Sequence, residues 1–319
     1  ISAGVTSTIN IAAVNDATVM VAGANRAYTE GVSATAISSG LTLSDVDDTA
    51  IASGATVSIT AGLTSGDVLS IASGSLLGGA TASYNSGTGV LTFTGSTTVS
   101  NYQSMLRAVS FSSTSEDPTS QSTTRTVTYS VTDANASAAS NSAQTTTATS
   151  TVTITAVNDT PVGTAGGSLA YTENGAATAI DTTITLIDVD DTQIVGATVT
   201  ITSALTGDVL GFTGQNDITG IYDASTGVLT LTGTATLAQY ETALRSVTYR
   251  STSDDPTVAN TRNSRTVTWV VTDANSDSVG AQTSTGVTST INIAAVNDAA
   301  VMVAGANRAY TEGVSATAI

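Results

Sequence analysis

The most regular feature of the 319-residue chain is an alternation of polar and apolar residues in short segments. Residues 56–59 read TVSI, residues 151–154 read TVTI and residues 266–271 read TVTWVV. A period of two places apolar side chains on one face of a β-strand and polar side chains on the other, which is typical of antiparallel sandwiches. We therefore predict an all-β fold, with Trp269 and its counterpart Tyr129 in the cores.

Turn signals and a helical segment complete this pattern. Residues 86–89 (SGTG) and 224–227 (ASTG) separate consecutive predicted strands. Leu237, Tyr240 and Leu244 have helical spacing, and the corresponding segment of the first half has the same spacing. Seven or more short strands in each stretch of about 140 residues predict tandem immunoglobulin-like β-sandwiches with one short helix per unit.

The sequence repeats itself at intervals of 143 and then 139 residues, measured between the Asn residues of three VND tripeptides (Asn15, Asn158 and Asn297). The segment YTE begins at residues 28, 171 and 310, and DVDD begins at residues 45 and 188. Self-similarity at a fixed period is typical of tandem repeats. We predict the end of a preceding repeat in residues 1–16, full repeats in 17–158 and 159–297, and the start of a following repeat in 298–319.

A longer period is stricter. Residues 4–17 are identical to 286–299, and residues 19–37 are identical to 301–319, both at an offset of 282. Such identity indicates recent duplication of a block of two repeats. We therefore expect the chain to be a window of a longer array.

The charge balance narrows the possible functions. The chain has 25 acidic and 8 basic residues, a net charge of −17, and neither Cys nor His. Nucleic acid and anionic membranes are poor partners for such a chain, and no apolar stretch approaches the roughly 18 residues of a membrane-spanning helix. Without His, Cys or Lys, a pair of carboxylates is the one remaining catalytic option. Because the carboxylates recur in every repeat, we predict a protein that is not an enzyme.

Most acidic residues gather at recurring places. In the first repeat these are Glu30, Asp45, Asp47, Asp48, Glu116, Asp117 and Asp133, and in the second Glu173, Asp188, Asp190, Asp191, Asp254, Asp255 and Asp273. Aspartates separated by one residue in an extended chain point the same way, and Ca²⁺ takes six to eight oxygen ligands. The alternative interpretation is that the VND and DVDD segments are turns and solvated loops whose side chains cap backbone amides.

The order of these motifs resembles the cadherin repeat. It reads Glu173-Asn174, then Asp188-Val189-Asp190, with the linker Asn158-Asp159-Thr160-Pro161 between repeats. The long unit, with YTE at its start and SDDPT at residues 253–257, resembles the cadherin-like repeats of giant bacterial surface adhesins, and the resemblance covers both repeats. It implies cadherin-like β-sandwiches with Ca²⁺ at each junction between repeats.

The resemblance also implies which residues hold the ions. At the first junction they are Asn15, Asp16, Asp45, Asp47, Asp48 and Asp133. At the central junction they are Glu30, Glu116, Asp117, Asn158, Asp159, Asp188, Asp190, Asp191 and Asp273. At the last junction they are Glu173, Asp254, Asp255, Asn297 and Asp298. Animal cadherin linkers are richer in acids, which here favours fewer or weaker ions, and the Asp-Pro pairs are equally typical of plain turns.

For function, the resemblance implies a structural extender, or stalk, of a giant adhesin on the bacterial cell surface that supports adhesion or biofilm formation. Calcium at the junctions would restrict the linkers, and the partners would be neighbouring repeats of the same chain. The alternative is that the repeats bind surface polysaccharide or sister chains, or assemble into an extracellular filament. Binding repeats should group exposed aromatic residues on one face, and a 4% aromatic content favours the stalk.

Overall fold

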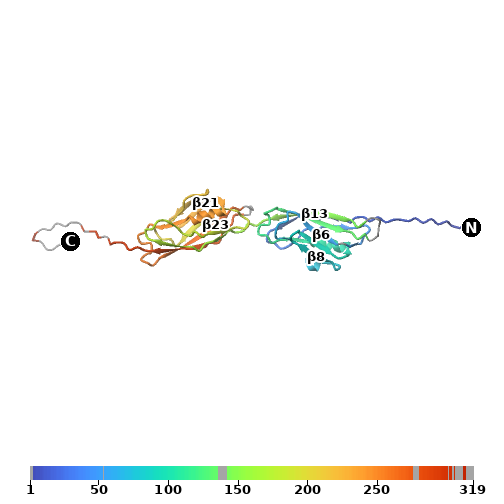
Figure 1. Cartoon of the computed structure of the whole chain (residues 1–319), viewed down its shortest axis with the longest axis horizontal. Coiled ribbons are helices and arrows are strands. Elements are labelled where there is room, and N and C mark those ends of the chain that lie inside the picture. The colour runs from blue at the N-terminus through green and yellow to red at the C-terminus, as the bar shows by residue number, and fades with distance from the viewer. Residues whose placement is uncertain are drawn as a thin grey trace. The chain divides into compact units, whose positions relative to one another are not determined.

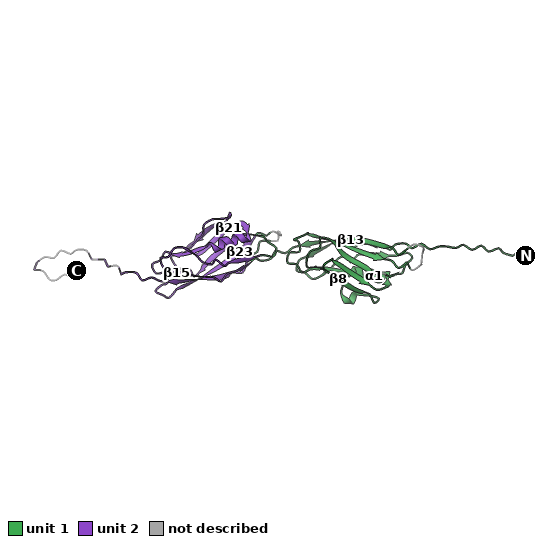
Figure 2. Cartoon of the chain, in the orientation of Figure 1, with its two compact units in different colours: residues 1–161, 188–192, 274–282 green, residues 162–187, 193–273, 283–319 purple. Residues whose placement is uncertain are grey.

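The computed structural model describes residues 3–52, 54–135, 142–275, 280–300, 302–303, 305 and 312–313. Most of the predicted following repeat, including Tyr310 and Thr311, therefore lies outside the described residues. Two compact units are present (Figure 2). The first unit comprises residues 1–161, 188–192 and 274–282, and the second comprises residues 162–187, 193–273 and 283–319.

The first unit is built almost entirely of strands. Its elements are β1 (Val19–Val21), β2 (Arg26–Thr29), β3 (Thr35–Ala36), β4 (Thr42–Ser44), β5 (Ala50–Ile51), β6 (Ala55–Ala61), β7 (Asp67–Ser70), a 3₁₀ turn (Ser73–Ser75), β8 (Thr81–Asn85), β9 (Val90–Thr94), β10 (Thr97–Thr98), α1 (Val99–Arg107), β11 (Ser110–Ser113), β12 (Thr124–Thr132) and β13 (Thr145–Thr155). The largest sheet has the order β2-β13-β12-β6-β9-β8, three strands of which are labelled in Figure 1. A three-stranded sheet, β3-β11-β7, and the pairs β1-β4 and β10-β5 complete the unit.

The second unit repeats this plan. Its elements are β14 (Val162–Thr164), β15 (Ser168–Thr172), β16 (Thr178–Ala179), β17 (Thr185–Ile187), β18 (Gln193–Thr202), β19 (Asp208–Gly211), β20 (Thr219–Asp223), β21 (Val228–Thr236), α2 (Leu237–Arg245), β22 (Thr248–Ser251), β23 (Ser264–Asp273) and β24 (Val287–Ala294). Its sheets have the orders β15-β24-β23-β18-β21-β20, β16-β22-β19 and β14-β17.

Strand direction is also the same in the two large sheets. Strand β2 runs parallel to β13, with Tyr28 opposite Ile154, and β15 runs parallel to β24, with Tyr171 opposite Ile293. The other pairings within these sheets are antiparallel. The parallel strand at the edge of each large sheet is the second strand of its unit and lies beside the last strand of that unit, so an early segment of each unit is held next to its end.

Each core lies between the six-stranded and the three-stranded sheet. The first core joins Tyr129 of β12 to Leu69 and Phe111 of the smaller sheet, and all three are completely buried. The second core is centred on Trp269, which is 2% exposed. The alternating segments supply the buried faces because every second residue points inward. The predicted sandwich fold and the predicted core positions of Tyr129 and Trp269 are thus confirmed.

The predicted short helix is present in each unit. Both helices begin at a threonine cap: Thr98 accepts a hydrogen bond from the Asn101 amide, and Thr236 forms a capping box with Gln239. Each also buries a tyrosine whose hydroxyl donates to a glycine carbonyl on the preceding segment, at 2.5 Å in both units. The helices are therefore fixed to their sheets by both apolar and polar contacts.

Helix side chains also hold the strand that leads into each DVDD segment. Gln103 of α1 accepts a hydrogen bond of 2.9 Å from the Leu43 amide of β4. Glu241 of α2 accepts one of 2.8 Å from the Leu186 amide of β17. These contacts satisfy backbone donors of short strands, and they fix the strand that immediately precedes each DVDD segment. Within the described residues, no helix is long and apolar enough to span a membrane.

Candidate metal centre

The loop after β4 forms a turn around one carboxylate oxygen. Oδ1 of Asp45 accepts hydrogen bonds from the backbone amides of Asp47 (3.1 Å) and Asp48 (2.9 Å). This is the side-chain-to-backbone turn that the alternative interpretation predicts for DVDD. Oδ1 of Asp188 makes the same contacts to the amides of Asp190 (3.4 Å) and Asp191 (3.2 Å). The turn uses one oxygen of each first aspartate and leaves the second oxygen for another role.

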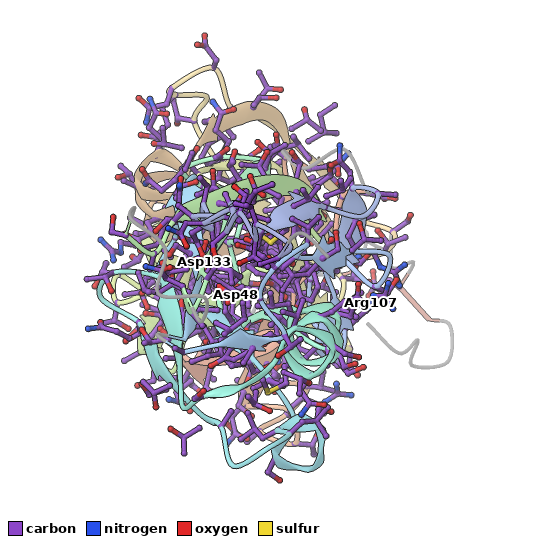
Figure 3. The ribbon with its side chains drawn as sticks, turned by 90° about the vertical axis from the view of Figure 1, so that its right-hand side faces the viewer. Asp48, Arg107 and Asp133 are labelled. Carbon is purple, nitrogen blue, oxygen red and sulfur yellow. The ribbon has the colours of Figure 1, made fainter. Side chains whose placement is uncertain are left out.

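Around the first of these loops, predicted ligands converge into a first acidic cluster, which consists of Asn15, Asp16, Asp45, Asp47, Asp48 and Asp133. Carboxylate oxygens of Asp45, Asp48 and Asp133 lie within 4.8 Å of one another, and Asp48 and Asp133 are close together in Figure 3, where Arg107 lies apart. The Asn15 side chain donates a hydrogen bond of 3.0 Å to Asp133. The Asp16 amide donates one of 3.2 Å to Asp47.

The second acidic cluster consists of Glu30, Glu116, Asp159, Asp188, Asp190 and Asp191, all within the first compact unit. Carboxylate oxygens of Glu30, Glu116 and Asp159 lie within 4.8 Å of one another, and those of the three aspartates of the DVDD loop do likewise. The Asp159 amide joins these two groups through a hydrogen bond of 2.9 Å to Oδ2 of Asp190. Residues from distant parts of the sequence thus meet at one place.

The linker itself is held against the second cluster. Oε2 of Glu30 accepts a hydrogen bond of 2.8 Å from the amide of Val157, and the Glu30 amide donates one of 3.0 Å to the carbonyl of Thr155. The side chain of Asn158, which is also buried, donates to the carbonyl of Asp159 at 3.4 Å. Glu30 therefore fixes the backbone where the VND tripeptide begins.

Buried carboxylate oxygens in both clusters have no hydrogen-bond partner among the described residues. They include Oδ2 of Asp45, Oδ1 of Asp47, Oε1 of Glu30, and Oδ2 of Asp159 and Asp188. An unpaired buried charge is costly, and turn formation does not explain these oxygens because it uses the opposite atom of Asp45 and Asp188. Carboxylate oxygens within 4.8 Å of one another in each cluster are the kind of donor set that a hard cation such as Ca²⁺ accepts. The residues present therefore fit a calcium ion.

Carboxylate pKa values show how unfavourable the clusters are without a cation. Burial is the main cause that raises the pKa of Glu30 to about 7, against the hydrogen bond from Val157, which lowers it. The nearby charge of Asp159 raises the Glu30 pKa further. Burial likewise raises the pKa of Asp188 to about 7, with Asp190 adding to the shift, and it raises that of Asp45. Opposite charge from a cation would reverse these effects.

The other predicted ligands lie outside these groups of three carboxylates in the described structure. Glu173 accepts a hydrogen bond of 2.7 Å from the Val296 amide, as Glu30 does from Val157, and its Oε1 has no partner among the described residues. Asp273 is fully buried at the end of β23. The remaining ones, whose role in a site stays a prediction, are Asp117, Asp254, Asp255, Asn297 and Asp298.

At the Asp-Pro pairs, the structure favours the turn interpretation for one residue. Both carboxylate oxygens of Asp255 accept from the amide of Ala259, at 3.1 and 2.8 Å, and Oδ1 also accepts from the hydroxyl of Thr257 at 3.2 Å. These bonds stabilise the loop that follows β22. A serine turn precedes both Asp-Pro pairs, because the Asp255 amide donates to the Ser253 hydroxyl and the Asp117 amide to the Ser115 hydroxyl, each at 3.2 Å.

Sequence reasoning missed a buried ion pair in each unit. Nε of Arg125 lies 2.5 Å from Oδ2 of Asp67, and Nε of Arg265 lies 2.6 Å from Oδ2 of Asp208, with these side chains at most 1% exposed. A signal was present, because Gly-Asp-Val-Leu occurs at residues 66–69 and again at 207–210. A single acidic residue inside an otherwise strand-like segment indicates a buried partner, but spacing alone does not identify an arginine so distant in sequence.

Comparison with known proteins gives one sequence relative and several structural ones. No protein-family profile matches the chain. Halomucin of Haloquadratum walsbyi (strain DSM 16790 / HBSQ001) is 40% identical over 91 residues, which are 26% of this chain and 1% of halomucin. The chain thus corresponds to only a very small part of that protein.

The solved structures found are cadherin ectodomains. Extracellular cadherin domains 1–5 of protocadherin gamma B2 share 14% identity, with 89% of this chain and 40% of that chain covered and a TM-score of 0.39. Domains EC1-2 of human protocadherin-24 share 13% identity, with 88% of this chain and 100% of that chain covered and a TM-score of 0.33. With TM-scores this low, the sandwich fold rests on the strand topology of the chain itself.

Proposed function

We propose that both acidic clusters bind Ca²⁺ and that the chain belongs to the calcium-stabilised stalk of a large extracellular surface adhesin of bacteria. One observation carries the calcium assignment: within the carboxylate clusters, the same buried oxygen of two equivalent aspartates 143 residues apart, Oδ2 of Asp45 and Oδ2 of Asp188, has no partner among the described residues. A cation would offset the mutual repulsion of these groups. In each cluster it would be held by the DVDD loop together with the VND linker.

The donor chemistry favours calcium over other metals. Ligands available in the clusters are carboxylate, amide and backbone carbonyl oxygens, and the sequence has no His or Cys to favour zinc, copper or iron. Magnesium requires a strict octahedron and retains much of its water, whereas calcium accepts many oxygens in a flexible arrangement. Loops that already form turns around Asp45 and Asp188 suit the less demanding ion.

Several features support a stalk over a repeat that binds a ligand. Every aromatic side chain within the described residues is buried or half-buried. The surface formed by the described residues therefore lacks the group of exposed aromatic side chains that is expected of a polysaccharide site. Recurrence of the clusters favours a structural task, because an enzyme's active site is normally unique. The match to 1% of halomucin fits repeats inside a very long protein. The repeat bounds 17–158 and 159–297 remain part of this proposal.

Within the stalk, calcium would act by restricting the linker. Residues 157–159 are bonded to Glu30 and to Asp190, so an ion shared by these carboxylates would fix the linker backbone. Loss of the ion would release that constraint and restore the repulsion. A chain of such repeats would then resist bending in calcium and soften without it.

The test is calcium binding to the chelator-stripped chain by isothermal titration calorimetry. We expect binding by the wild type, loss or on the order of tenfold weakening of one set of sites in Asp45→Asn, and the same at the other cluster in Asp188→Asn, which is about 1.4 kcal/mol each. Asp223→Asn is the matched control, because Asp223 caps an exposed turn outside both clusters. An absence of binding by the wild type, or equal weakening by the control, would contradict the proposal.

A further inference from the structure

The guanidinium of Arg125 holds a loop as well as a carboxylate. Arg125 lies on β12 and is 0% exposed. Besides its contact with Asp67, its Nη2 donates a hydrogen bond of 2.6 Å to the Pro118 carbonyl, and its Nη1 donates one of 2.6 Å to the Ser122 carbonyl. Both carbonyls belong to the loop between β11 and β12. A planar, rigid fork of donors is suited to fixing several acceptors at once.

That loop carries a member of the second acidic cluster. Glu116 is two residues from Pro118, and its side chain is exposed although a carboxylate oxygen lies within 4.8 Å of those of Glu30 and Asp159. The start of the loop is also fixed, because the Thr114 amide donates a hydrogen bond of 3.0 Å to the Gly66 carbonyl, next to Asp67. The segment that presents Glu116 is therefore held on both sides, at Thr114 by Gly66, the neighbour of Asp67, and at Pro118 by Arg125.

The second unit contains the same device at another loop. Nη2 of Arg265 donates a hydrogen bond of 2.6 Å to the Pro256 carbonyl, and Nη1 donates one of 2.8 Å to the Arg262 carbonyl. Its carboxylate partner is Asp208. This arginine is as buried as Arg125, but the loop that it fixes carries none of the residues of the second acidic cluster. Arg265 is therefore a control of the same chemistry.

We propose that Arg125, oriented by Asp67, is a positioning residue that presents Glu116 to the cation of the second acidic cluster. This inference rests on the proposed calcium function. A ligand on a free loop must lose conformational entropy when the ion binds, whereas a ligand on an anchored loop has lost it on folding. Residues that orient metal ligands typically change affinity by about 10- to 100-fold when replaced. Arg125 would act on affinity through Glu116 alone.

A double-mutant cycle tests this assignment on the full chain. The variants are Arg125→Lys, which keeps the charge and loses the fork, Glu116→Gln and the combination of both. Calcium titrations would be followed at the amide resonances of Val157 and Asp159, which report the second cluster directly. We expect Arg125→Lys to weaken calcium binding about tenfold in the wild-type background and less than about twofold in the Glu116→Gln background. Equal weakening in both backgrounds, or none, would overturn the inference.

Two further variants separate positioning from folding. Arg265→Lys makes the same change in the second unit and should leave calcium binding at Val157 and Asp159 unaltered.

Ser115→Ala lies outside the core and removes the hydroxyl that accepts from the Asp117 amide, so it should weaken binding even if Arg125→Lys does not fold. We expect Ser115→Ala to have no effect on calcium binding in the Glu116→Gln background. A similar weakening by Ser115→Ala in that background would count against the inference. If the wild type binds calcium and Glu116→Gln weakens binding, but neither Arg125→Lys nor Ser115→Ala does, the inference about Arg125 fails and the calcium proposal stands. If the wild type does not bind calcium, the calcium proposal itself fails.

Discussion

The backbone amide of Asp159 donates a hydrogen bond of 2.9 Å to Oδ2 of Asp190, and this contact has a counterpart 143 residues earlier, where the Asp16 amide donates to Oδ2 of Asp47 at 3.2 Å. In both places the linker backbone is bonded to the third residue of a DVDD segment. Asp190 therefore has two separable properties. Its side chain is an acceptor for the linker, and its charge adds to the repulsion within the second acidic cluster.

Replacing Asp190 by Asn should change stability in opposite directions with and without calcium. Asn keeps an oxygen acceptor for the Asp159 amide but removes the charge that raises the pKa of Glu30 and Asp159. We expect the melting temperature to rise by about 2–4 °C in chelator and to fall by a similar amount in calcium, where a ligand is lost. Calorimetric melting of both proteins in both buffers measures this. A shift of the same sign in both buffers would show that the charge does not act through a cation.

Without calcium, the protein should become less stable as the pH rises from about 4.5 to about 7. The folded-state pKa of Glu30, raised mainly by burial to about 7, lies above the unfolded value of 4.5. The folded protein then binds more protons than the unfolded chain in this interval, so the free energy of unfolding falls as the pH rises through it. Asp188 should contribute in the same direction, because its folded-state pKa is also about 7. Urea unfolding in chelator at several pH values measures the slope.

Calcium should remove much of this pH dependence, because the ion takes the place of the protons. Glu30→Gln is the informative variant, since it removes the group and should flatten the slope in chelator. A stability that rises across this interval in chelator would contradict the interpretation of the second acidic cluster as a set of uncompensated carboxylates.

The second unit contains a carboxylate with the opposite behaviour. Asp181 is buried, which by itself raises its pKa, but hydrogen bonds from Ser289 (2.6 Å), Thr183 (2.8 Å) and Gly166 (3.1 Å) outweigh burial and hold the pKa below its usual value. Ser289 in turn accepts a hydrogen bond of 2.9 Å from Nε1 of Trp269. Asp181 thus contributes stability that is present above its unfolded-state pKa and is lost as the pH falls.

Asp181→Ala should lower the free energy of unfolding of the second unit by about 2–4 kcal/mol, because it leaves several buried donors without an acceptor. Fluorescence of Trp269, the single tryptophan of the chain, monitors this unit. The matched position of the first repeat is Ser38, which accepts from the Gly23 amide at 2.6 Å, and Ser38→Ala should cost only about 1 kcal/mol. Calcium affinity should not change in either variant. An unaltered denaturation midpoint of Asp181→Ala would show that the network contributes nothing.

The fold could be predicted from sequence because its causes are local and repeated. Alternation along segments such as residues 266–271 determines which side chains enter the core, and the spacing of Leu237, Tyr240 and Leu244 identifies the helix. Neither signal requires knowledge of a distant residue. Repetition at two places in the chain made each interpretation more secure.

Prediction of the site was partial for a physical reason. Asp45, Asp47 and Asp48 could be predicted to act together because they are neighbours in the sequence. Glu30 and Glu116 are distant in sequence, and the resemblance to cadherin repeats was needed to assign them as metal ligands. Pairing of Arg125 with Asp67 depends on two strands meeting across the core, 58 residues apart in sequence, and no periodicity encodes that meeting. A loop turn such as that around Asp255 is equally hidden, since the same residue type can bind an ion or its own backbone.

Thermal unfolding of the chain in calcium and after chelation by EGTA tests the central claim most directly. A ligand that binds only the folded state adds about 2.7 kcal/mol at a concentration a hundredfold above its Kd. We predict a clearly higher melting temperature in calcium, lost on chelation, restored by calcium and restored poorly by magnesium. Superimposable melts in the two buffers would contradict the account and would leave the acidic clusters as loops that only cap their own backbone.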